Sequence, residues 1–409
     1  MKRSFAIVIF IIIALTTFAS DSLNVRCVGR ALDDTTCFAV KDVYIQGNYA
    51  YCACDREGLI ILDITDPTDP IEVGRLDTPG IAEAVWVGDT LAYIADWNGG
   101  LRIIDVSNPS TPTEIGTTYV GEMAMDVMVR ENYAYIGTRG SGMKIVDISD
   151  PYSPYCFVIP TFSTSQVVRS IVFSDDYAFI TGNPYVSGSI WVVDVTDPPS
   201  TYQVEHHGFE DVIYSSALTD SLAFFGTFNG IAVYSRSTTG LYLDYVTSYE
   251  IGSEGSWVKG LVARPPYLFA AFAYNGLQIY DITDPTTSLP NVGYYDTEYR
   301  AHAVFLKDSL AYVADMEGGL YILEITSFPD VIAEGSLPEN NEIQIYPNPF
   351  NSRCKIICNK PIEIYNISGN LIKTIDGVNE WIPDSRISSG IYLLKAKGSK
   401  QWRKAILLQ

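Results

Sequence analysis

Five ionisable residues of the kinds that move protons or hold charged groups stand at matched places along the chain. Each lies two residues before a short apolar run that begins a repeated unit. With the two residues that fill the same place in other units, the set is Lys41, Glu83, Met125, Arg169, Ser215, Lys259 and His302. An acid, a base and several cations suit general acid–base catalysis by a hydrolase or lyase, or polar contacts with a ligand.

A second set of chemically suggestive residues recurs in a loop later in each unit. Its members are Arg56, Glu57, Trp97, Asn98, Arg139, Tyr185, Phe228, Asn229, Tyr274, Asn275, Met316 and Glu317. Aromatic side chains beside Asn, Arg or Glu suit stacking on sugars or packing against a peptide. The alternative is that several of them pack against a neighbouring unit.

Signatures of other chemistry are weak. The three histidines, His206, His207 and His302, lack the spacing of a zinc site, so no metal is predicted. The acids of the pattern Asp63-Ile64-Thr65-Asp66, which precedes Pro67, recur once per unit. This allows calcium but favours turns, since Asp at a strand end accepts backbone N–H bonds. We find no Gly-x-Ser-x-Gly elbow, phosphate loop or dinucleotide fingerprint. No cofactor is predicted, and an enzyme is the less favoured interpretation.

The units themselves repeat about every 42 to 45 residues. An acid near the end of an apolar run recurs at Asp63, Asp105, Asp147, Asp194, Asp281 and Glu324, with Ser235 in a degenerate copy. An aromatic anchor recurs at Tyr51, Tyr93, Tyr135, Phe179, Phe224, Phe269 and Tyr312. Seven copies of one pattern indicate a repeat architecture.

Each copy contains four strand-like runs separated by turn residues. In the second copy these are 84–87, 91–95, 101–106 and 114–118. Near-continuous apolar runs suit strands covered on both faces, and four strands per unit, repeated radially, form a propeller blade. The seventh copy lacks its fourth strand, and 28–33 (VGRALD) echoes the fourth strand 73–77 (VGRLD) of the first copy. We therefore expect an all-β, seven-bladed propeller over 20–326, closed by its N-terminal strand.

In such a ring the first set of ionisable residues should surround the mouth of the central channel. Their predecessors are mostly small and apolar, and successive side chains of a strand point to opposite faces, so the set should share one face. The loops of the second set should lie on that same face. A divergent polar ring on a repeated scaffold suggests ligand binding, whereas a merely solvated channel is the plainer alternative.

The strings LIILDITDP, LRIIDVSNP, MKIVDISDP, IWVVDVTDP and LQIYDITDP resemble the LVIVD repeat family. The resemblance covers about residues 28–326. It implies a β-propeller, often found on bacterial surfaces, and no established enzyme chemistry. The fifth copy departs from the pattern, with Val233-Tyr234-Ser235-Arg236 and no Asp-Pro.

The chain begins like a signal peptide. Lys2 and Arg3 precede an apolar run, and small residues place cleavage after Ala19, giving a leader over 1–19. The run is too short for a membrane span, so no transmembrane segment should remain. Residues 20–340 hold 15 basic and 43 acidic residues, and a body that acidic excludes nucleic acid as a partner.

The last part of the chain follows a Pro-containing linker, 327–342. Residues 343–409 hold the string Tyr346-Pro347-Asn348-Pro349-Phe350, a turn-rich Tyr365–Gly369 stretch and an Ile387–Tyr392 strand near a basic end. These elements resemble the type A C-terminal sorting domain of the type IX secretion system, and imply contact with that machinery. We expect residues 343–409 to form a small immunoglobulin-like β-sandwich that serves in sorting; a purely structural role for this sandwich is the alternative.

Together these observations predict an exported protein, at the cell surface or outside, that has passed through the periplasm. The favoured function is a binding module for an extracellular protein or carbohydrate. A channel-mouth enzyme using Glu83 or His302 with Arg169 or Lys259 is one alternative, and a self-assembling structural protein is another.

Overall fold

The computed structural model of the chain describes residues 22–33, 36–157, 167–183, 187–237, 242–251 and 257–326, and short strand segments of the tail. The predicted leader, 1–19, lies outside the described residues. The chain divides into two compact units, Met1–Ser327 and Phe328–Gln409. Each unit is described by itself.

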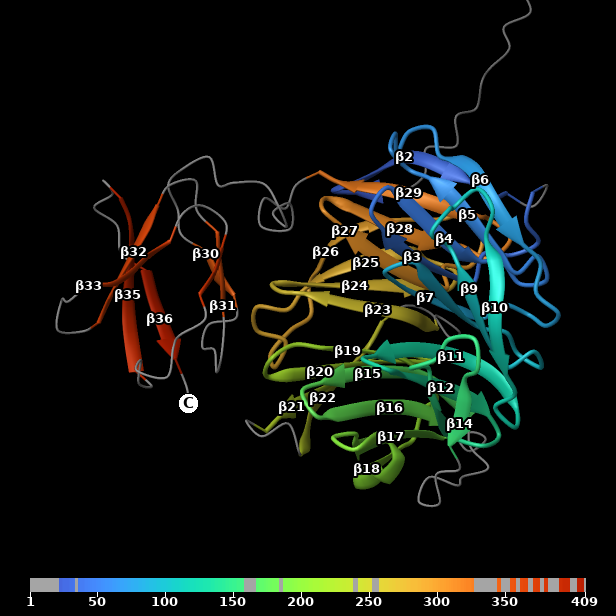
Figure 1. Cartoon of the computed structure of the whole chain (residues 1–409). Helices are drawn as coiled ribbons and strands as arrows, with labels where there is room; N and C mark the ends of the chain where they lie inside the picture. The colour runs from blue at the N-terminus through green and yellow to red at the C-terminus, as the bar shows by residue number, and fades with distance from the viewer. Residues whose placement is uncertain are drawn as a thin grey trace, which may run out of the picture. The chain divides into compact units, whose positions relative to one another are not determined.

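The larger unit is a succession of antiparallel four-stranded groups, one for each sequence repeat (Figure 1). The first repeat holds β3 (Asp42–Gln46), β4 (Tyr49–Ala53), β5 (Leu59–Asp63) and β6 (Ile71–Leu76). The second holds β7 (Ala84–Gly88), β8 (Leu91–Ala95), β9 (Leu101–Asp105) and β10 (Thr113–Thr118). The third holds β11 (Met123–Arg130), β12 (Tyr133–Arg139), β13 (Met143–Asp147) and β14 (Tyr155–Phe157).

The later repeats keep this strand order. The fourth holds β15 (Val167–Ser174), β16 (Tyr177–Asn183), β17 (Gly188–Asp194), the 3₁₀ turn η1 (Pro198–Ser200) and β18 (Tyr202–Phe209). The fifth holds β19 (Ile213–Leu218), β20 (Leu222–Thr227), β21 (Gly230–Arg236) and β22 (Leu243–Glu250). The sixth holds β23 (Val258–Arg264), β24 (Tyr267–Phe272), β25 (Gly276–Asp281) and β26 (Asn291–Tyr295). The seventh holds β27 (Ala303–Lys307), β28 (Leu310–Ala314) and β29 (Leu320–Ile325).

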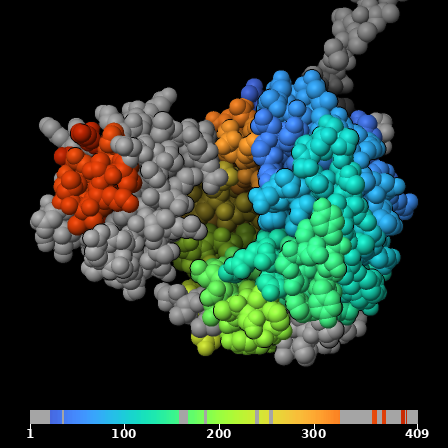
Figure 2. Space-filling model, viewed as in Figure 1, coloured from blue at the N-terminus to red at the C-terminus, as the bar shows by residue number. Residues whose placement is uncertain are grey.

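The first strands of the repeats contact one another in chain order, and β27 contacts β3. One residue pair, Arg139 and Val167, also joins the third and fourth repeats into a common sheet. In Figure 2 the early repeats, in blue and cyan, are followed by green bands of the third and fourth repeats on the visible face of this unit. The first strands therefore line the middle of the arrangement.

The seventh repeat receives its fourth strand from the start of the chain. β2 (Val25–Ala31) pairs antiparallel with β29, from Val25 opposite Ile325 to Ala31 opposite Leu320 (Figure 1). The short β1 (Ser22–Leu23) pairs instead with β26 of the sixth repeat. The described N-terminal segment thus joins two repeats that lie about 270 to 300 residues further along the chain.

A shared glycine explains why the sequence of β2 is so similar to the sequences of the fourth strands β6 and β10. A Cβ on Gly29 would stand 2.0 Å from the Pro67 carbonyl oxygen of the neighbouring Asp-Pro turn. Gly74 meets Pro109 in the same way at 2.1 Å, and Gly116 meets Pro151 at 1.9 Å. Any side chain at these three positions would collide with backbone, so glycine is required where β2, β6 and β10 cross the next repeat.

The core lies between the sheets. In β5, Ile60 and Leu62 pack with residues of the seventh repeat such as Ile322, while Leu59 and Ile61 pack with residues of the second repeat such as Val85. These four side chains of β5, Leu59 to Leu62, are all buried. Burial on both faces explains the near-continuous apolar runs, and each such side chain contributes about 1.5–3 kcal/mol.

The repeated acids act as turn devices, as predicted. Asp63 Oδ1 accepts the backbone N–H of Thr65 at 2.8 Å, and Asp105 accepts that of Ser107 at the same distance. Asp147, Asp194 and Asp281 repeat this contact. The hydrogen bonds to Thr65 lower the pKa of Asp63 and favour its charged form.

The described residues of the smaller unit form two sheets. One consists of β30 (Gln344–Tyr346), β31 (Cys354–Ile357) and β34 (Asn379–Trp381). The other consists of β32 (Ile362–Asn366), β33 (Leu371–Ile375), β35 (Gly390–Ala396) and β36 (Arg403–Leu407). Ile362, Ile364 and Leu394 are fully buried. Tyr346 ends β30, and the other four residues of the predicted sorting string, 347–350, lie outside the described residues.

Candidate functional site

The first set of predicted residues lies where consecutive repeats meet. The N–H groups of Lys41, Glu83 and His302 donate to the carbonyls that end the second strands of their own repeats, at 2.7–2.9 Å. The residue before each donates to a carbonyl of the preceding repeat; for example, Ala82 donates to Asp55 at 2.7 Å. Ala82 is fully buried at this junction, which explains why small apolar residues precede the polar ones.

In the third to sixth repeats a β-bulge inserts one extra residue at this place. The pairing of first and second strands skips Met125, Arg169, Tyr214 and Lys259. Assigning Ser215 to the set was therefore wrong by one residue, because Tyr214 takes the bulge position. Ser215 is instead buried, and its hydroxyl donates to the Val258 carbonyl of the next repeat at 2.9 Å. We call Lys41, Glu83, Met125, Arg169, Tyr214, Lys259 and His302 the channel ring.

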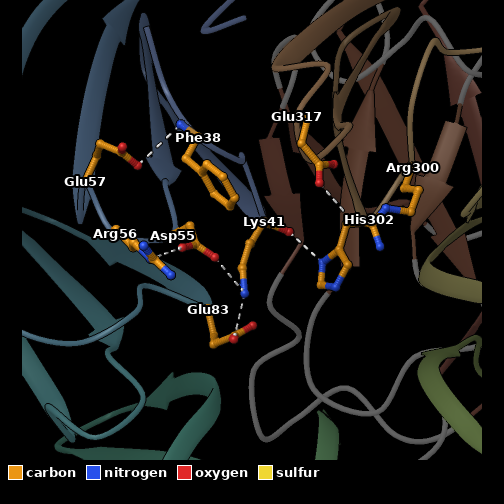
Figure 3. A network of polar contacts seen from close by, with 9 residues as sticks. All are labelled: Phe38, Lys41, Asp55, Arg56, Glu57, Glu83, Arg300, His302 and Glu317. Carbon is orange, nitrogen blue, oxygen red and sulfur yellow. Dashed lines mark hydrogen bonds and ion pairs between the residues drawn. The ribbon is translucent and has the colours of Figure 1, made fainter. Parts of the chain in front are cut away.

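One side of the channel ring is a compact charge network. Lys41 Nζ lies 2.8 Å from Glu83 Oε1 and 3.1 Å from Asp55 Oδ2, as Figure 3 shows. The three side chains are only 10–13% exposed. Burial by itself would lower the pKa of Lys41, but the charges and hydrogen bonds of Glu83 and Asp55 raise it. Lys41 therefore stays protonated with both carboxylates bound to it.

His302 lies beside this network and contacts its backbone. Its Nδ1 is 2.8 Å from the Lys41 carbonyl oxygen (Figure 3). A carbonyl only accepts, so Nδ1 carries the proton and Nε2 the lone pair. Burial, followed by the nearby charge of Lys259, lowers the pKa of His302 to about 3. A histidine held neutral in this way is a weak proton acceptor and an unsuited general acid at neutral pH.

The other side of the channel ring combines cations with aromatic rings. Lys259 Nζ lies 4.0 Å from the centroid of the Tyr214 ring and 4.7 Å from that of Trp257. Arg169 lies 5.0 Å from the Tyr214 ring, and its Nε donates to Asn183 Oδ1 at 2.9 Å. Among the residues that the structure describes, no carboxylate is within ion-pair distance of Lys259 or Arg169. Their positive charges are met by π-faces and an amide instead.

The electrostatic consequence is largest at Lys259. Burial, followed by repulsion from Arg169 and Arg300, lowers the pKa of Lys259 to about 7. Burial also lowers the pKa of Arg169, and the nearby Arg139 lowers it further. Perturbed groups of this kind cluster at functional sites, although ion networks produce them too.

Two of the predicted loop aromatics join this side of the channel ring through a residue that the sequence reasoning missed. The Trp257 ring lies 5.9 Å from that of Phe228, 6.2 Å from that of Tyr274 and 6.1 Å from that of Tyr214. We call these four residues the aromatic cluster. Tyr274 is 58% exposed, so the cluster reaches from the channel ring to the surface.

The other predicted loop residues are placed separately. Trp97 is half-buried and forms a backbone bridge to Ala124 of the next repeat, while Asn98 is exposed. Arg139 is exposed at the end of β12, near enough to Arg169 to act on its charge. Tyr185 lies outside the described residues. Within the described part of the chain, no three metal-ligating side chains converge.

Comparison with known families and structures defines the class. The LVIVD repeat family matches residues 39–78, 79–119, 121–158, 258–297 and 300–329. The chain covers 97% of the β-propeller domain of Cps50 (Swd1) from Myceliophteria thermophila with 71% of its own length, at 10% identity and a TM-score of 0.57. It covers 99% of the computationally designed Ika8 protein with 73% of its length, at 12% identity and a TM-score of 0.53. These likenesses show an all-β, propeller-like fold.

The tail identifies the chain further. Residues 344–409 match the secretion system C-terminal sorting domain. The chain thus contains LVIVD repeats on a propeller-like fold, followed by a type IX sorting domain. The sorting domain indicates export to the cell surface or beyond and contact with the secretion machinery. No curated protein matches the chain. Within the described residues, no helix has the length and apolar character needed to cross a membrane.

Proposed function

We propose that the protein is an exported binding module that holds an extracellular protein or glycan at the mouth of its channel. The observation that carries this proposal is the gathering of different side chains at equivalent junctions, polar in every repeat except the third, which contributes Met125. A scaffold that repeats its core while varying only this ring is suited to recognition. The exposed edge of the aromatic cluster adds an apolar surface beside the charges.

The architecture on which this rests is a closed ring of seven blades over residues 20–326. The contact of β27 with β3 and the pairing of β2 with β29 support closure, since both join the last repeat to the start of the chain. A linker over 327–342 then leads to residues 343–409, for which we propose an immunoglobulin-like sandwich made from the two sheets of the tail.

Catalysis at the channel ring is less well supported than binding. Glu83 is held by Lys41, and His302 has its Nδ1 proton on a backbone carbonyl. An acid–base pair needs one group poised near the working pH and free to reach the substrate. The lowered pKa of His302 and the ion pair of Glu83 both oppose that role.

The test of the binding function uses the mature protein on glycan and extracellular-protein arrays. We expect a specific signal that falls at least tenfold in a variant carrying Arg169→Gln, Lys259→Gln and Tyr274→Ala. Lys144→Gln, on β13 and away from the channel ring, is the matched control and should bind normally. No signal on either array, or equal binding by the triple variant, would overturn the proposal.

Sorting by the tail has its own test. Fractionation of a host that has a type IX system should find the full chain at the surface or in the medium, and a chain ending at Ser336 in the periplasm. The truncated propeller should keep its melting temperature, because its core lies within its own repeats. Equal surface amounts of both chains would exclude the sorting role, and unfolding of the shorter chain would exclude independent folding.

A further inference from the structure

The channel ring carries its positive charge unevenly. Lys41 is neutralised by two carboxylates, whereas Lys259 and Arg169 face the Tyr214 ring and, within the described residues, have no acid within ion-pair distance. Burying cations is costly unless they are paired. A site that keeps two such cations on one tyrosine ring is complementary to an anionic group that arrives from outside.

The surroundings of these cations indicate the shape of the arriving molecule. Tyr214 and Trp257 are stacked at an interplanar angle of 23°, and the cluster continues through Tyr274 to solvent. Flat aromatic faces with polar edges suit the apolar face of a ring-shaped ligand. A charged group held by Lys259 would therefore be attached to a ring that lies against an aromatic side chain.

A surface groove continues the site beyond Tyr274. Its volume is about 600 Å³, and it is lined by two tyrosines, three amides, one leucine and one acid: Leu23, Tyr274, Asn275, Gln278, Asn291, Tyr294 and Asp296. The amides are oriented by their own contacts: Gln278 Nε2 donates to the Asn275 carbonyl at 2.6 Å, and Asn291 Nδ2 donates to Gln278 Oε1 at 2.7 Å. Oriented amides beside a tyrosine offer hydrogen bonds to hydroxyl groups, and the groove has room for more than one sugar unit.

We propose that the channel ring and this groove together bind an acidic oligosaccharide through a carboxylate-bearing sugar. Its carboxylate contacts Lys259 and Arg169, its ring lies against Trp257 or Tyr214, and the next sugar units follow Tyr274 into the groove. This inference rests on the proposed binding function and specifies its ligand class. The acidic body of the protein opposes long-range attraction, but that repulsion is screened beyond about 10 Å at ordinary ionic strength.

A carboxylate at Lys259 has a consequence besides affinity. The groups that act on Lys259 are Arg169, Arg300 and Lys41, which are cationic, and Glu83; Tyr214 and Trp257 face it as rings. A bound anion favours the protonated amine, so binding near pH 8 should take up a proton. Affinity should then fall by up to about tenfold per pH unit above pH 7.

The experiment uses isothermal titration of the mature protein with a galacturonic acid oligomer, its methyl ester and a neutral galactose oligomer. We expect binding of the acid form only, with proton uptake shown by titrations in two buffers. Lys259→Gln and Arg169→Gln should each weaken binding about tenfold or more, whereas Lys259→Arg retains most of it. Tyr274→Ala should weaken it several-fold, and Lys144→Gln should leave it unchanged.

The possible results separate this inference from the function on which it rests. Equal binding of the ester and the neutral oligomer, or unchanged binding by Lys259→Gln, overturns the acidic-sugar assignment and leaves a glycan-binding module. Binding of a glutamate-rich peptide without binding of the acid oligomer overturns the assignment in favour of a protein partner. Binding of neither sugars nor proteins overturns both. Thermal melts of each variant confirm that lost binding is not lost folding.

Discussion

The two sides of the channel ring solve the same electrostatic problem in different ways. On one side Lys41 forms ion pairs with Glu83 and Asp55, so each charge has an opposite charge inside the protein. On the other side Lys259 lies over Tyr214 and Trp257 and Arg169 lies over Tyr214, and these π-faces offset only part of the cost of burial. Ion pairs within the fold offset the cost of burying their charges. Buried cations without an acidic partner carry a cost that a bound anion can relieve.

This difference also bears on how a polar channel should be read. A solvated channel needs no particular balance of positive and negative side chains, because water hydrates every charged group. The paired side is consistent with that plain interpretation, since its charges already have partners. The cationic and aromatic side is not, because its cations are buried against rings rather than hydrated.

The largest expected effect on stability follows from removing an ion pair of Lys41 on the paired side of the channel ring. Glu83→Ala removes the shorter of the two ion pairs of Lys41 and leaves a buried ammonium with Asp55 alone. We expect a loss of about 2–3 kcal/mol in the free energy of unfolding, measured by urea denaturation of the mature protein. Glu114→Ala, in a more exposed pair with Arg102, is the control and should cost under about 1 kcal/mol. Equal losses would remove the distinction between the two sides.

The opposite sign is expected on the cationic side. Lys259→Met removes a buried charge and keeps an apolar side chain against Tyr214 and Trp257, so stability should be unchanged or rise by about 1 kcal/mol near pH 7. The folded-state pKa of about 7 lies below the unfolded value, so the wild type becomes more stable as pH rises through 7 towards 10.5. The advantage of the variant should shrink over that window. Marked destabilisation at pH 7 would show that Lys259 has a structural partner.

The smallest effect near neutral pH concerns His302, which contacts the Lys41 carbonyl and feels the charge of Lys259. His302 has a folded-state pKa of about 3 against an ordinary value of 6.5, so the unfolded chain binds the extra proton between these values. Its contribution to stability is full above pH 6.5 and is lost as pH falls towards 3. Relative to His302→Asn, the wild type should therefore lose stability across this range, as measured by melts at fixed ionic strength. A difference that does not vary with pH would mean that His302 titrates normally in the fold.

Most of the fold and the outline of the site could be predicted from the period of the sequence repeat. Because each repeat is one packed unit, a matched spacing places Lys41, Glu83 and His302 at equivalent junctions, and the structure has them there. The same β-bulge occurs at Met125, Arg169 and Lys259, which the spacing found correctly. In the fifth repeat the residue two after the bulge is the polar Ser216, so counting back from the first apolar residue, Ala217, gave Ser215 in place of Tyr214.

Asp55 and Trp257 were missed for different reasons. Aligning the loops on their left-handed glycines, Gly58 at φ 72° and Gly100 at φ 76°, would have matched Asp55 to Trp97 and drawn attention to it. Trp257 precedes its strand and has no counterpart of similar chemistry in the other repeats. Its role depends on distances to Phe228 and Tyr274, which come from two different repeats and cannot be read from one.

The pairing of β2 with β29 also sets the order in which parts of the larger unit fold. Arg26 and Glu324, which contact one another across this pair, are separated by 298 residues. A contact of that range has a high loop-closure cost, so it forms late. The earlier repeats can pack against their neighbours in chain order, but β2 stays unpaired until the last repeat has folded. We therefore expect a slow final folding step.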